Sequence, residues 1–413
     1  MKLFTINWRN QVSRVNREFQ EALPVLSKLK KHGFEAYFVG GSVRDQLLGK
    51  AIKDVDIASS ATPDQVQQLF QKTVDIGSEH GTVIVIENGI HYEITTFRTE
   101  SAYEDNRRPS GVTFVSSLKE DLKRRDFTIN AMAMDENGSI IDYFNGREDA
   151  EKKRIATVGS PAERFSEDAL RMMRAVRFVS QLGFSLSEGT HDAIVSHISL
   201  LKHISAERKT AEFEKTMAGS GCSEGMRLIA ETGMTEYLPG LKEKKQQILQ
   251  AAELPFYRLS SNEERWTAFL DVIGISGIEA FLKKWKLSNK QIGSIRQNLL
   301  FLEERRQTDW TKVNLYRAGL QCALQTEAVY CLLNGLPFSE SKIREIKARY
   351  HSLPVHSKRE LAVNGNDLMA FEGRNPGPWL SEYMEKIELA VVNGQVENSK
   401  EAIKEMLKSC NLN

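Results

Sequence analysis

The chain has 413 residues, of which 41% are apolar and 27% charged, and its net charge at neutral pH is +1. These values fit about two to four folded domains and exclude a globally basic surface, so any contact with nucleic acid must come from local clusters of cations. The four cysteines show no CxxC spacing, which argues for reduced thiols in the cytoplasm and against a zinc site. Neither a signal peptide nor a membrane span is expected, because no suitable apolar run is found.

Short strands and short helices alternate in the N-terminal third. Residues 1–16 form a polar extension, and the apolar spacing from Glu18 to Lys31 predicts a helix. Beyond that helix, a Thr-Pro pair predicts the start of a short helix, and two Asn-Gly turns predict hairpins. The predicted strands are FEAYFVG, DVDIA, TVIVIE and HYEITTF, with the hairpin turns at Asn88-Gly89 and Asn137-Gly138. Residues 17–150 are therefore expected to form a mixed α/β domain.

After Ile155 the strand signals nearly vanish, and one helical pattern follows another to the C-terminus. The predicted fold class is therefore α+β, with a mixed α/β head followed by an all-α remainder. Gly-containing turns interrupt the helices, and internal borders are expected near residues 208 and 300. The helical part is thereby divided into residues 151–208, 209–300 and 301–413.

Two carboxylates one residue apart, Asp54 and Asp56, lie in the apolar segment DVDIA. Because side chains alternate along a strand, both are expected on one face, where two anions repel each other unless a cation lies between them. Mg²⁺ would relieve the repulsion and leave coordination positions for phosphate oxygens. A pair of solvated acids at a strand end is the plainer interpretation of this motif on its own.

A glycine pair and an arginine precede the carboxylates in the segment GGSVRD. The glycines, Gly41 among them, allow backbone N–H groups at a helix start to approach phosphates. Arg44 supplies a planar fork for phosphate oxygens. Glycines, arginine and DxD in this order indicate a site for a nucleoside triphosphate.

The pattern GG-x-VRD-x-LLG-x₄-D-x-D resembles the signature of the class II tRNA nucleotidyltransferases, in the polymerase β-like nucleotidyltransferase superfamily. Further segments similar to the bacterial members follow in order: KRRDFTINAMAM, IIDYFNGREDA, RFSEDALRMMRAVRF, ERKTAEFEK and LAVNGNDLM. The resemblance runs from about residue 20 to the end. It implies a catalytic head, a neck, a helical body and a tRNA-binding tail. It also implies an enzyme that builds or repairs the 3′-terminal CCA of tRNA from CTP and ATP without a nucleic-acid template.

The resemblance also implies roles for individual residues. Asp54 and Asp56 are the expected catalytic carboxylates and ligands of Mg²⁺, and Asp126 is expected to orient nearby basic groups. Glu93 is either a third acidic ligand or a structural acid of its strand. The expected nucleotide-binding residues are Gly41, Arg44, Arg125, Asp168, Arg171, Arg174 and Arg177.

The segment SEDALRMMRAVRF is expected to select the base. Asp168 and Arg171 would be i,i+3 neighbours on a helix that is too apolar to be fully solvated. A carboxylate accepting the amino proton and a guanidinium donating to the ring nitrogen fit both cytosine and adenine. Uracil and guanine present the opposite polarity, which would leave both side chains unpaired. The alternative is an intrahelical salt bridge, with Arg174 and Arg177 exposed.

The loop TESAYEDNRRPSG is charged and lies between two strands. In the family that the sequence resembles, this loop switches the enzyme from CTP to ATP. The residues that match the family's pattern are Glu104, Asp105, Arg108 and Pro109. An ordinary surface loop is the alternative interpretation.

Two further features invite a functional interpretation. His191-Asp192 is an HD dipeptide, but no further ligands at helical spacing accompany it, so a structural role is expected. The basic residues Lys342, Arg344, Lys347 and Arg349 share one predicted helix, where contact with tRNA phosphates and a solvated face are equally supported.

Other functions stay open at this point. The nearest are an enzyme that adds only A and a bacterial poly(A) polymerase, although the segment DIGSEHGTVIVI favours the CCA type over the polymerase. A catalytically silent tRNA-binding protein is a rival from another class, and the intact carboxylates argue against it. A cytoplasmic location is expected, and the chain is either a monomer or a homodimer.

Overall fold

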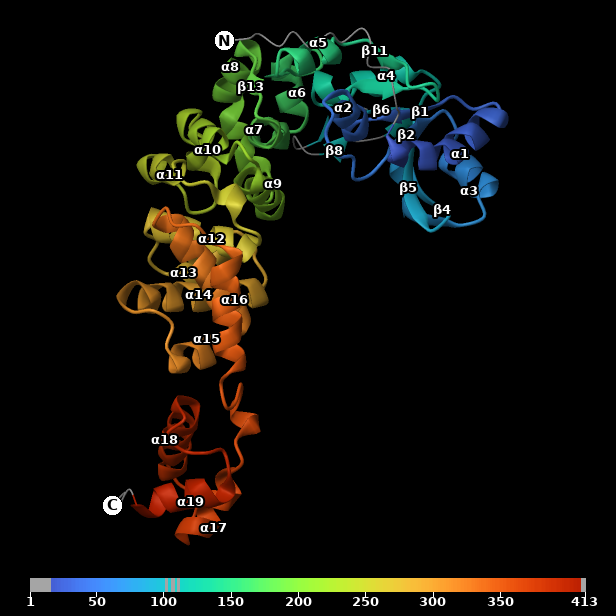
Figure 1. Ribbon diagram of the computed structural model, residues 1–413. Helices are drawn as coiled ribbons and strands as arrows, with labels where there is room; N and C mark the ends of the chain where they lie inside the picture. Colours follow the sequence, from blue (N-terminus) through green and yellow to red (C-terminus); the bar gives the residue numbers. More distant parts are fainter. Residues whose placement is uncertain (1–15, 101–102, 105–107, 110–111, 410–413) are drawn as a thin grey trace. The chain divides into compact units, whose positions relative to one another are not determined.

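The computed structural model of the chain describes residues 16–100, 103–104, 108–109 and 112–409. It divides into two compact units, Met1–Gln246 and Gln247–Asn413. The first unit contains a mixed sheet with helices, and the second is helical (Figure 1). The predicted α+β class is confirmed.

A seven-stranded sheet with the order β11-β10-β1-β2-β5-β4-β3 forms the centre of the N-terminal region. Only β2 and β5 run parallel, and every other neighbouring pair is antiparallel. The strands are β1 (Ala36–Val39), β2 (Asp56–Ser59), β3 (Thr73–Gly77), β4 (Thr82–Glu87), β5 (Ile90–Thr96), β10 (Met132–Met134) and β11 (Ile140–Asp142). Three small pairs lie outside this sheet: β6 (Arg98–Glu100) with β9 (Val112–Phe114), β7 (Tyr103–Glu104) with β8 (Arg108–Pro109), and β12 (Arg154–Ile155) with β13 (Ser185–Leu186).

Local turn chemistry forms the β4–β5 hairpin as predicted. Asn88 and Gly89 both have positive φ, of 52° and 80°, which matches the right-handed twist of the flanking strands. Thr62 caps the next predicted helix start, and its hydroxyl accepts a bond from the Gln65 amide in a capping box. Both predictions are confirmed. They could be made from the sequence because each feature depends only on neighbouring residues.

Ten α-helices and four 3₁₀ turns accompany the strands in the described part of the first unit. The α-helices are α1 (Arg17–Lys31), α2 (Gly41–Leu47), α3 (Pro63–Leu69), α4 (Leu118–Lys123), α5 (Gly146–Glu151), α6 (Pro161–Glu167), α7 (Leu170–Leu182), α8 (Glu188–His197), α9 (Ala206–Ala218) and α10 (Cys222–Glu231). The 3₁₀ turns are η2 (Ser78–His80), η3 (Thr128–Asn130), η4 (Ile198–His203) and η5 (Met234–Tyr237). His191 and Asp192 of the HD dipeptide contact each other on α8, where His191 is half-buried and Asp192 is exposed.

The main core of the head lies between the sheet and α1. Phe19 of α1 packs on Phe38 of β1 with ring centroids 4.9 Å apart, and Ile57 of β2 belongs to the same buried cluster. Burying such side chains stabilises the fold by about 1.5–3 kcal/mol each. The buried strands thereby fix the position of Asp56, at the start of β2.

Helix α7 packs closely on α9 and α10 through a cluster of small residues. Ser180 donates a hydrogen bond to the Thr216 carbonyl at 2.6 Å, and its own carbonyl accepts from the Gly221 amide at 2.7 Å. A Cβ atom on Gly219 would lie 2.2 Å from Ser180 Oγ and 2.6 Å from the Ser180 carbonyl carbon. The glycine is therefore required by the close approach of two backbones, and it fixes where α7 lies.

The second unit is built of helices around its own core. After α11 (Lys245–Ala251), its elements are η6 (Phe256–Arg258), α12 (Asn262–Ile273), α13 (Ile278–Lys284), α14 (Asn289–Gln307), α15 (Lys312–Leu333), α16 (Glu340–His351), η7 (Lys358–Glu360), α17 (Gly365–Glu372), α18 (Trp379–Asn393) and α19 (Lys400–Ser409). Trp266 and Trp285 are fully buried, with ring centroids 5.1 Å apart. Along the described residues, no helix is both long and apolar enough to cross a membrane.

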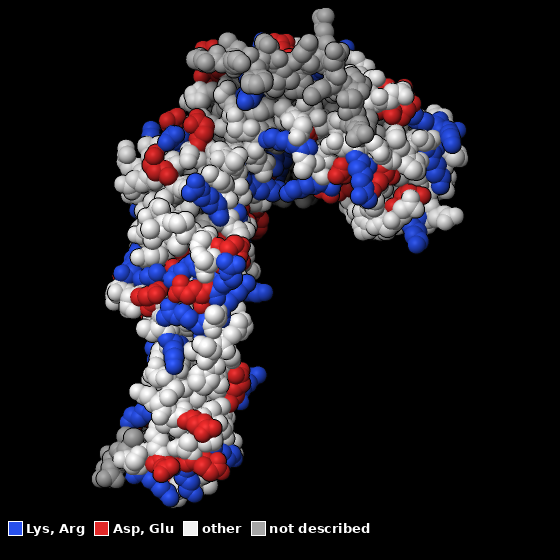
Figure 2. All heavy atoms as spheres, viewed as in Figure 1, with Lys and Arg blue, Asp and Glu red and all other residues white. Residues whose placement is uncertain are grey.

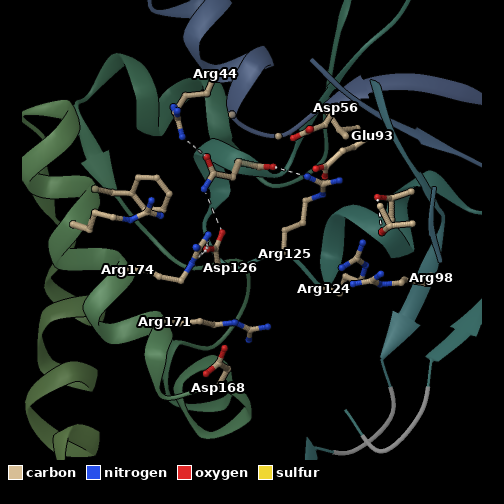
Figure 3. Close-up of a pocket in the computed structure, with 18 of the residues that line it drawn as sticks. Arg44, Asp56, Glu93, Arg98, Arg124, Arg125, Asp126, Asp168, Arg171 and Arg174 are labelled. Carbon is tan, nitrogen blue, oxygen red and sulfur yellow. Dashed lines mark hydrogen bonds and ion pairs between the residues drawn. The ribbon is translucent and has the colours of Figure 1, made fainter. Parts of the chain in front are cut away.

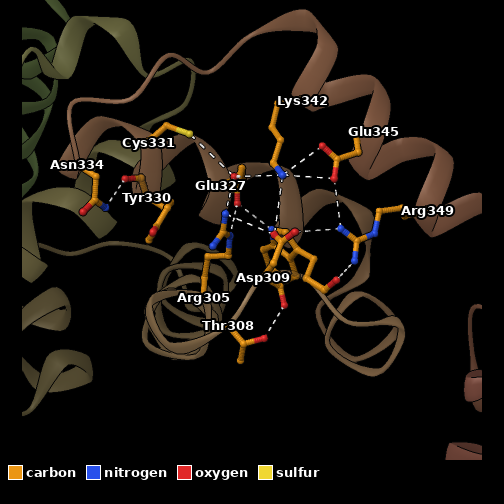
Figure 4. Close-up of polar contacts among 11 residues, drawn as sticks. Arg305, Thr308, Asp309, Glu327, Tyr330, Cys331, Asn334, Lys342, Glu345 and Arg349 are labelled. Carbon is orange, nitrogen blue, oxygen red and sulfur yellow. Dashed lines mark hydrogen bonds and ion pairs between the residues drawn. The ribbon is translucent and has the colours of Figure 1, made fainter.

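The four basic residues of helix α16 differ in their surroundings, and Figure 4 shows the contacts of two of them, Lys342 and Arg349. Lys342 Nζ lies 3.2 Å from Glu345 and 4.0 Å from the buried Glu327, and Arg349 Nη1 lies 3.2 Å from both Glu345 and Asp309. These two cations therefore hold the helix to its own unit. Arg344 and Lys347 are exposed, so the prediction of phosphate contacts stays open for them.

The close approach at Gly219 can be tested by unfolding. Gly219→Ala should lower the free energy of unfolding by about 1–3 kcal/mol, because an added methyl overpacks two backbones. Gly189→Ala is the matched control: Gly189 lies in α8 with no heavy atom within 4 Å of its Cβ position. The control should be neutral or stabilising by up to about 1 kcal/mol. Equal urea-unfolding midpoints for the two variants would contradict the packing argument.

Candidate active site

A cavity of about 670 Å³ in the first unit is lined by all the predicted nucleotide-binding residues and by one of the two predicted catalytic carboxylates. Lys and Arg side chains surround the hollow seen in Figure 2, and Figure 3 shows the lining at close range. The predicted residues that line it are Gly41, Arg44, Asp56, Arg125, Asp168, Arg171, Arg174 and Arg177, and Glu93 and Asp126 join them. The lining comes from the sheet, from α2, from the segment around η3 and from α7.

Two carboxylates face the cavity from neighbouring parallel strands. Asp56 of β2 is in register with Glu93 of β5, so both side chains leave the sheet on the same face. Burial, the nearby charge of Glu93 and that of Asp54 together raise the pKa of Asp56 to about 6, against the opposing effect of Arg125. Glu93 therefore lies where a second acidic group of the site is expected.

The position of Asp54 differs from the one predicted. It is exposed, it does not line the cavity, and it lies two residues before β2, so the expectation that both carboxylates belong to one strand is wrong. The reason is a non-local one. Strand β1 ends at Val39, which pairs with Asp56, so β1 has no residue to pair with Asp54. Asp54 contributes its negative charge near Asp56 from outside the cavity.

The glycine pair leaves room for two guanidinium groups. Gly40 has a φ of 75°, and a Cβ atom there would lie 3.2 Å from Arg125 Nη1 and 3.6 Å from Asp56 Oδ2. A Cβ atom on Gly41 would lie 3.4 Å from Arg44 Nη2. The glycines therefore let Arg44 and Arg125 approach the strand end that carries Asp56.

Arg44 is held firmly although it faces the cavity. It is only 8% exposed, and its Nη1 donates to Asn130 Oδ1 at 2.7 Å. Its Nη2 lies 2.9 Å from Asp45 Oδ1, and its guanidinium carbon lies 5.5 Å from the centre of the Phe178 ring. Such a preorganised cation can bind phosphate without first reorganising.

The fully buried carboxylate of Asp121 binds two arginines, Arg124 and Arg125. Asp121 Oδ1 accepts from Arg124 Nη2 at 2.8 Å, and its Oδ2 accepts from Arg125 Nη2 at 3.2 Å. Burial alone would raise the pKa of Asp121, but Arg125 and Arg124 outweigh it and keep the pKa below its usual value. Asp121 thus stays ionised and orients Arg125 toward the cavity.

Asp126 joins the segment around η3 to helix α7, as expected for a residue that orients basic groups. Its Oδ2 lies 2.7 Å from Arg174 Nε and 2.6 Å from Arg174 Nη2. Its Oδ1 accepts from Asn130 Nδ2 at 3.3 Å. Burial would raise the pKa of Asp126, but Arg174 and Asn130 keep it below its usual value.

Asp168 and Arg171 both line the cavity, but not as members of one helix. Helix α6 ends at Glu167, and α7 begins at Leu170, whose amide donates to Asp168 Oδ1 at 3.0 Å. The expected shared helix is therefore wrong, because the extended backbone of Asp168 ends α6 and its side chain binds the first amide of α7. Asp168 Oδ2 accepts from Arg208 Nη2 at 2.7 Å.

Partners on the protein side also orient the arginines of α7. Arg171 pairs with Glu167 and donates to the Arg164 carbonyl at 3.1 Å. Arg177 Nε lies 2.7 Å from Glu212 Oε2, and its guanidinium stacks 4.3 Å from the Phe178 ring centre. Arg177 is buried and Arg174 is half-buried, so the alternative that leaves both exposed is wrong for Arg177.

The predicted switch loop lies partly outside the described residues. Asp105 is among the residues not described, and only the backbone of the other three is placed. Glu104 and Arg108 face each other in the short antiparallel pair β7–β8. The role of this loop stays a prediction.

Several residues of the site were not predicted. Each lies in or near a segment that was singled out, but its contacts are made with distant parts of the chain or with neighbours already assigned another role. The missed residues are Asp121, Asn130, Glu167, Phe178, Arg208 and Glu212. Asp121 and Glu167 carried a local signal, since each lies three or four residues from the arginines that it binds.

Comparisons with known proteins give the family. Residues 36–156 match the poly A polymerase head domain, residues 183–245 the probable RNA and SrmB-binding site of polymerase A, and residues 257–407 a putative tRNA nucleotidyltransferase domain 2. The CCA-adding enzyme of Geobacillus kaustophilus is 53% identical, over 93% of this chain and 95% of that protein. The CCA-adding enzyme of Bacillus licheniformis is 50% identical, over 95% and 98%.

A solved structure agrees with these sequences. The CCA-adding enzyme of Bacillus stearothermophilus, crystallised in complex with CTP, superimposes with a TM-score of 0.91 at 48% identity. The match covers 96% of this chain and 98% of that one. On the strength of identity over nearly the full length of its relatives, the chain belongs to the family of bacterial CCA-adding enzymes.

Proposed function

We propose that this chain adds CMP, CMP and AMP in turn to the 3′ end of tRNA, using CTP and ATP and releasing pyrophosphate. One observation carries the proposal: acidic groups, phosphate-type arginines and an Asp–Arg pair suited to base selection line a single cavity. Relatives at about 50% identity are CCA-adding enzymes, which favours this activity over A-only addition or poly(A) synthesis. The substrates tRNA, CTP and ATP support a cytoplasmic location.

The phosphate end of the cavity supplies positive charge in fixed positions. Arg44 and Arg125 lie beside the glycine pair and Asp56, each oriented by a carboxylate of the protein. A triphosphate held there would place its α-phosphate for in-line attack by the tRNA 3′-hydroxyl. Positioning and electrostatic stabilisation account for most of the catalysis in phosphoryl transfer.

A divalent metal fits the acidic side of the site. Nucleotidyltransferases generally use divalent metals, and the oxygen donors Asp56 and Glu93 suit Mg²⁺, with Asp54 adding negative charge. The pKa of Asp56 is raised mainly by burial and next by the charge of Glu93, and a bound cation would offset both effects. No group of three or more His, Cys, Asp or Glu in the described part of the chain is arranged to hold a metal, so substrate oxygens would complete the shell. Bound Mg²⁺ would stabilise charge on the attacking and leaving oxygens.

Base selection falls to Asp168 and Arg171. The carboxylate would accept from the amino group of cytosine or adenine, and the guanidinium would donate to the ring nitrogen beside it. Arg208 and Glu167 hold the two side chains in place from behind. UTP and GTP would leave both charges without a partner in a partly dry site, which makes their rejection strong.

The four-part division of the chain completes the proposal. Residues 17–150 form the catalytic head, 151–208 the base-selecting neck, 209–300 the body and 301–413 the tail that binds tRNA. The loop with Glu104, Asp105, Arg108 and Pro109 acts after two additions, when the specificity changes from CTP to ATP.

The activity can be tested with tRNAs that lack all of CCA, its last two nucleotides or only its last one, with each nucleotide supplied separately. The proposal expects CMP on the first two substrates and AMP on the third alone. AMP addition with no CMP addition on any of them would identify an A-only enzyme and overturn the proposal.

The carboxylate role predicts a loss common to both nucleotides. Asp56→Asn should lower kcat for CMP and AMP incorporation by about 10²-fold or more, because an amide cannot supply the negative charge. Binding of tRNA should persist in a gel-shift assay. Asp192→Asn, an exposed change on α8, is the matched control. A variant at position 56 that kept near-normal turnover would remove Asp56 from the mechanism.

The base-selecting role predicts a change of preference. Asp168→Asn offers a donor to O4 of uracil, so UTP incorporation relative to CTP should rise about tenfold in competition assays on tRNA lacking CCA. If Asp168 served only to cap α7 and bind Arg208, stability would fall while the preference stayed unchanged. That result would contradict the assignment.

A further inference from the structure

Asn130 lies between a cation and an anion at the back of the cavity. Its Oδ1 accepts from Arg44 Nη1 at 2.7 Å, and its Nδ2 donates to Asp126 Oδ1 at 3.3 Å. The residue is 8% exposed and sits at the end of the 3₁₀ turn η3. Its backbone carbonyl also accepts from Arg125 Nη1 at 3.5 Å.

The chemistry of the amide explains why asparagine occupies this position. Its oxygen faces a guanidinium and its nitrogen faces a carboxylate, so both ends meet the partner that they prefer. An aspartate would bind Arg44 but repel Asp126, and an alanine would leave both partners without this bond. The amide orientation is therefore fixed by charge on each side.

The contacts of Asn130 belong to a continuous series of hydrogen bonds and ion pairs along the wall of the cavity. Arg174 on α7 binds Asp126, Asp126 binds Asn130, and Asn130 binds Arg44 on α2. We call these four residues the relay; the labelled residues Arg174, Asp126 and Arg44 are seen in Figure 3. At one end, Arg174 lies on α7, the helix expected to contact the base of the nucleotide. At the other end, Arg44 is expected to contact its phosphates.

We propose that Asn130 is a positioning residue that sets Arg44 against the phosphates of the incoming nucleotide and couples Arg44 to helix α7. The identity of the ligand rests on the proposed function. The contacts of Asn130 do not depend on which nucleotide is added, so its role concerns the phosphate side for CTP and ATP alike. Asn130 itself does not touch the reacting atoms.

The first test uses inorganic pyrophosphate, which has phosphates but no base. Asn130→Ala should raise the dissociation constants of pyrophosphate, CTP and ATP by a common factor of about ten, since a hydrogen bond to a charged group is lost. Thr128→Val is the matched control: it removes the 2.6 Å bond to Asp149 from the same turn and leaves the cavity intact. Equal effects of both variants on pyrophosphate would reduce Asn130 to a structural role.

The second test measures the coupling. Arg174→Lys keeps the charge but alters the geometry of the pair with Asp126, so it should weaken pyrophosphate binding by a few-fold in the parent protein. In the Asn130→Ala background the same change should have almost no effect. Strictly multiplicative effects in this double-mutant cycle would overturn the coupling.

A further variant keeps the proposal testable if Asn130→Ala does not fold. Asn130→Asp retains an acceptor for Arg44 but adds a negative charge beside Asp126, so it should weaken pyrophosphate binding and lose the coupling to Arg174. Retained coupling in this variant would contradict the relay. All these quantities are binding measurements on the full chain without tRNA. A failure of CCA addition in the parent protein would therefore refute the proposed function and leave the relay to be judged separately.

Discussion

The buried ion pair between Asp126 and Arg174 is the interaction on which the rest of the site depends. It joins the segment before η3 to helix α7, with guanidinium and carboxylate in direct contact; the Asp126 carboxylate is little exposed, and Arg174 is half-buried. Removing one partner of such a pair costs about 3–5 kcal/mol, because the other charge is left buried and uncompensated. The pair therefore fixes the base-facing helix against the strand end that carries Asp56, and a nucleotide must fit both at once.

The cavity gathers cations that would repel one another without local compensation. Carboxylates on the protein side hold several of these arginines: Asp121 holds Arg125 and Glu212 holds Arg177, for example. Phe178 adds an aromatic face within 6 Å of three guanidinium groups, which favours their close approach. A triphosphate entering such a site meets charges that are already in place. Preorganisation of this kind makes electrostatic stabilisation effective.

The sequence predicted what depends on neighbouring residues. The Asn88-Gly89 turn and the α+β order were predictable because turn chemistry and apolar periodicity are local. The position of Asp54 could not be predicted, because the start of β2 is set by pairing with β1. The last residue of β1, Val39, pairs with Asp56 and lies about 17 residues earlier in the chain. The end of α6 at Asp168 was hidden inside a continuous helical pattern. Asn130 was missed because its partner Arg44 lies 86 residues away.

The central claim is that one cavity serves both CTP and ATP, with the protein reading the base. The most direct test uses calorimetry on the full chain with Mg²⁺ and without tRNA. It measures how many nucleotides bind per chain and whether they compete with one another. The account predicts one site per chain, with ATP displacing CTP completely and with UTP and GTP binding more weakly by about tenfold or more. Simultaneous binding of CTP and ATP, at two sites per chain, would contradict it.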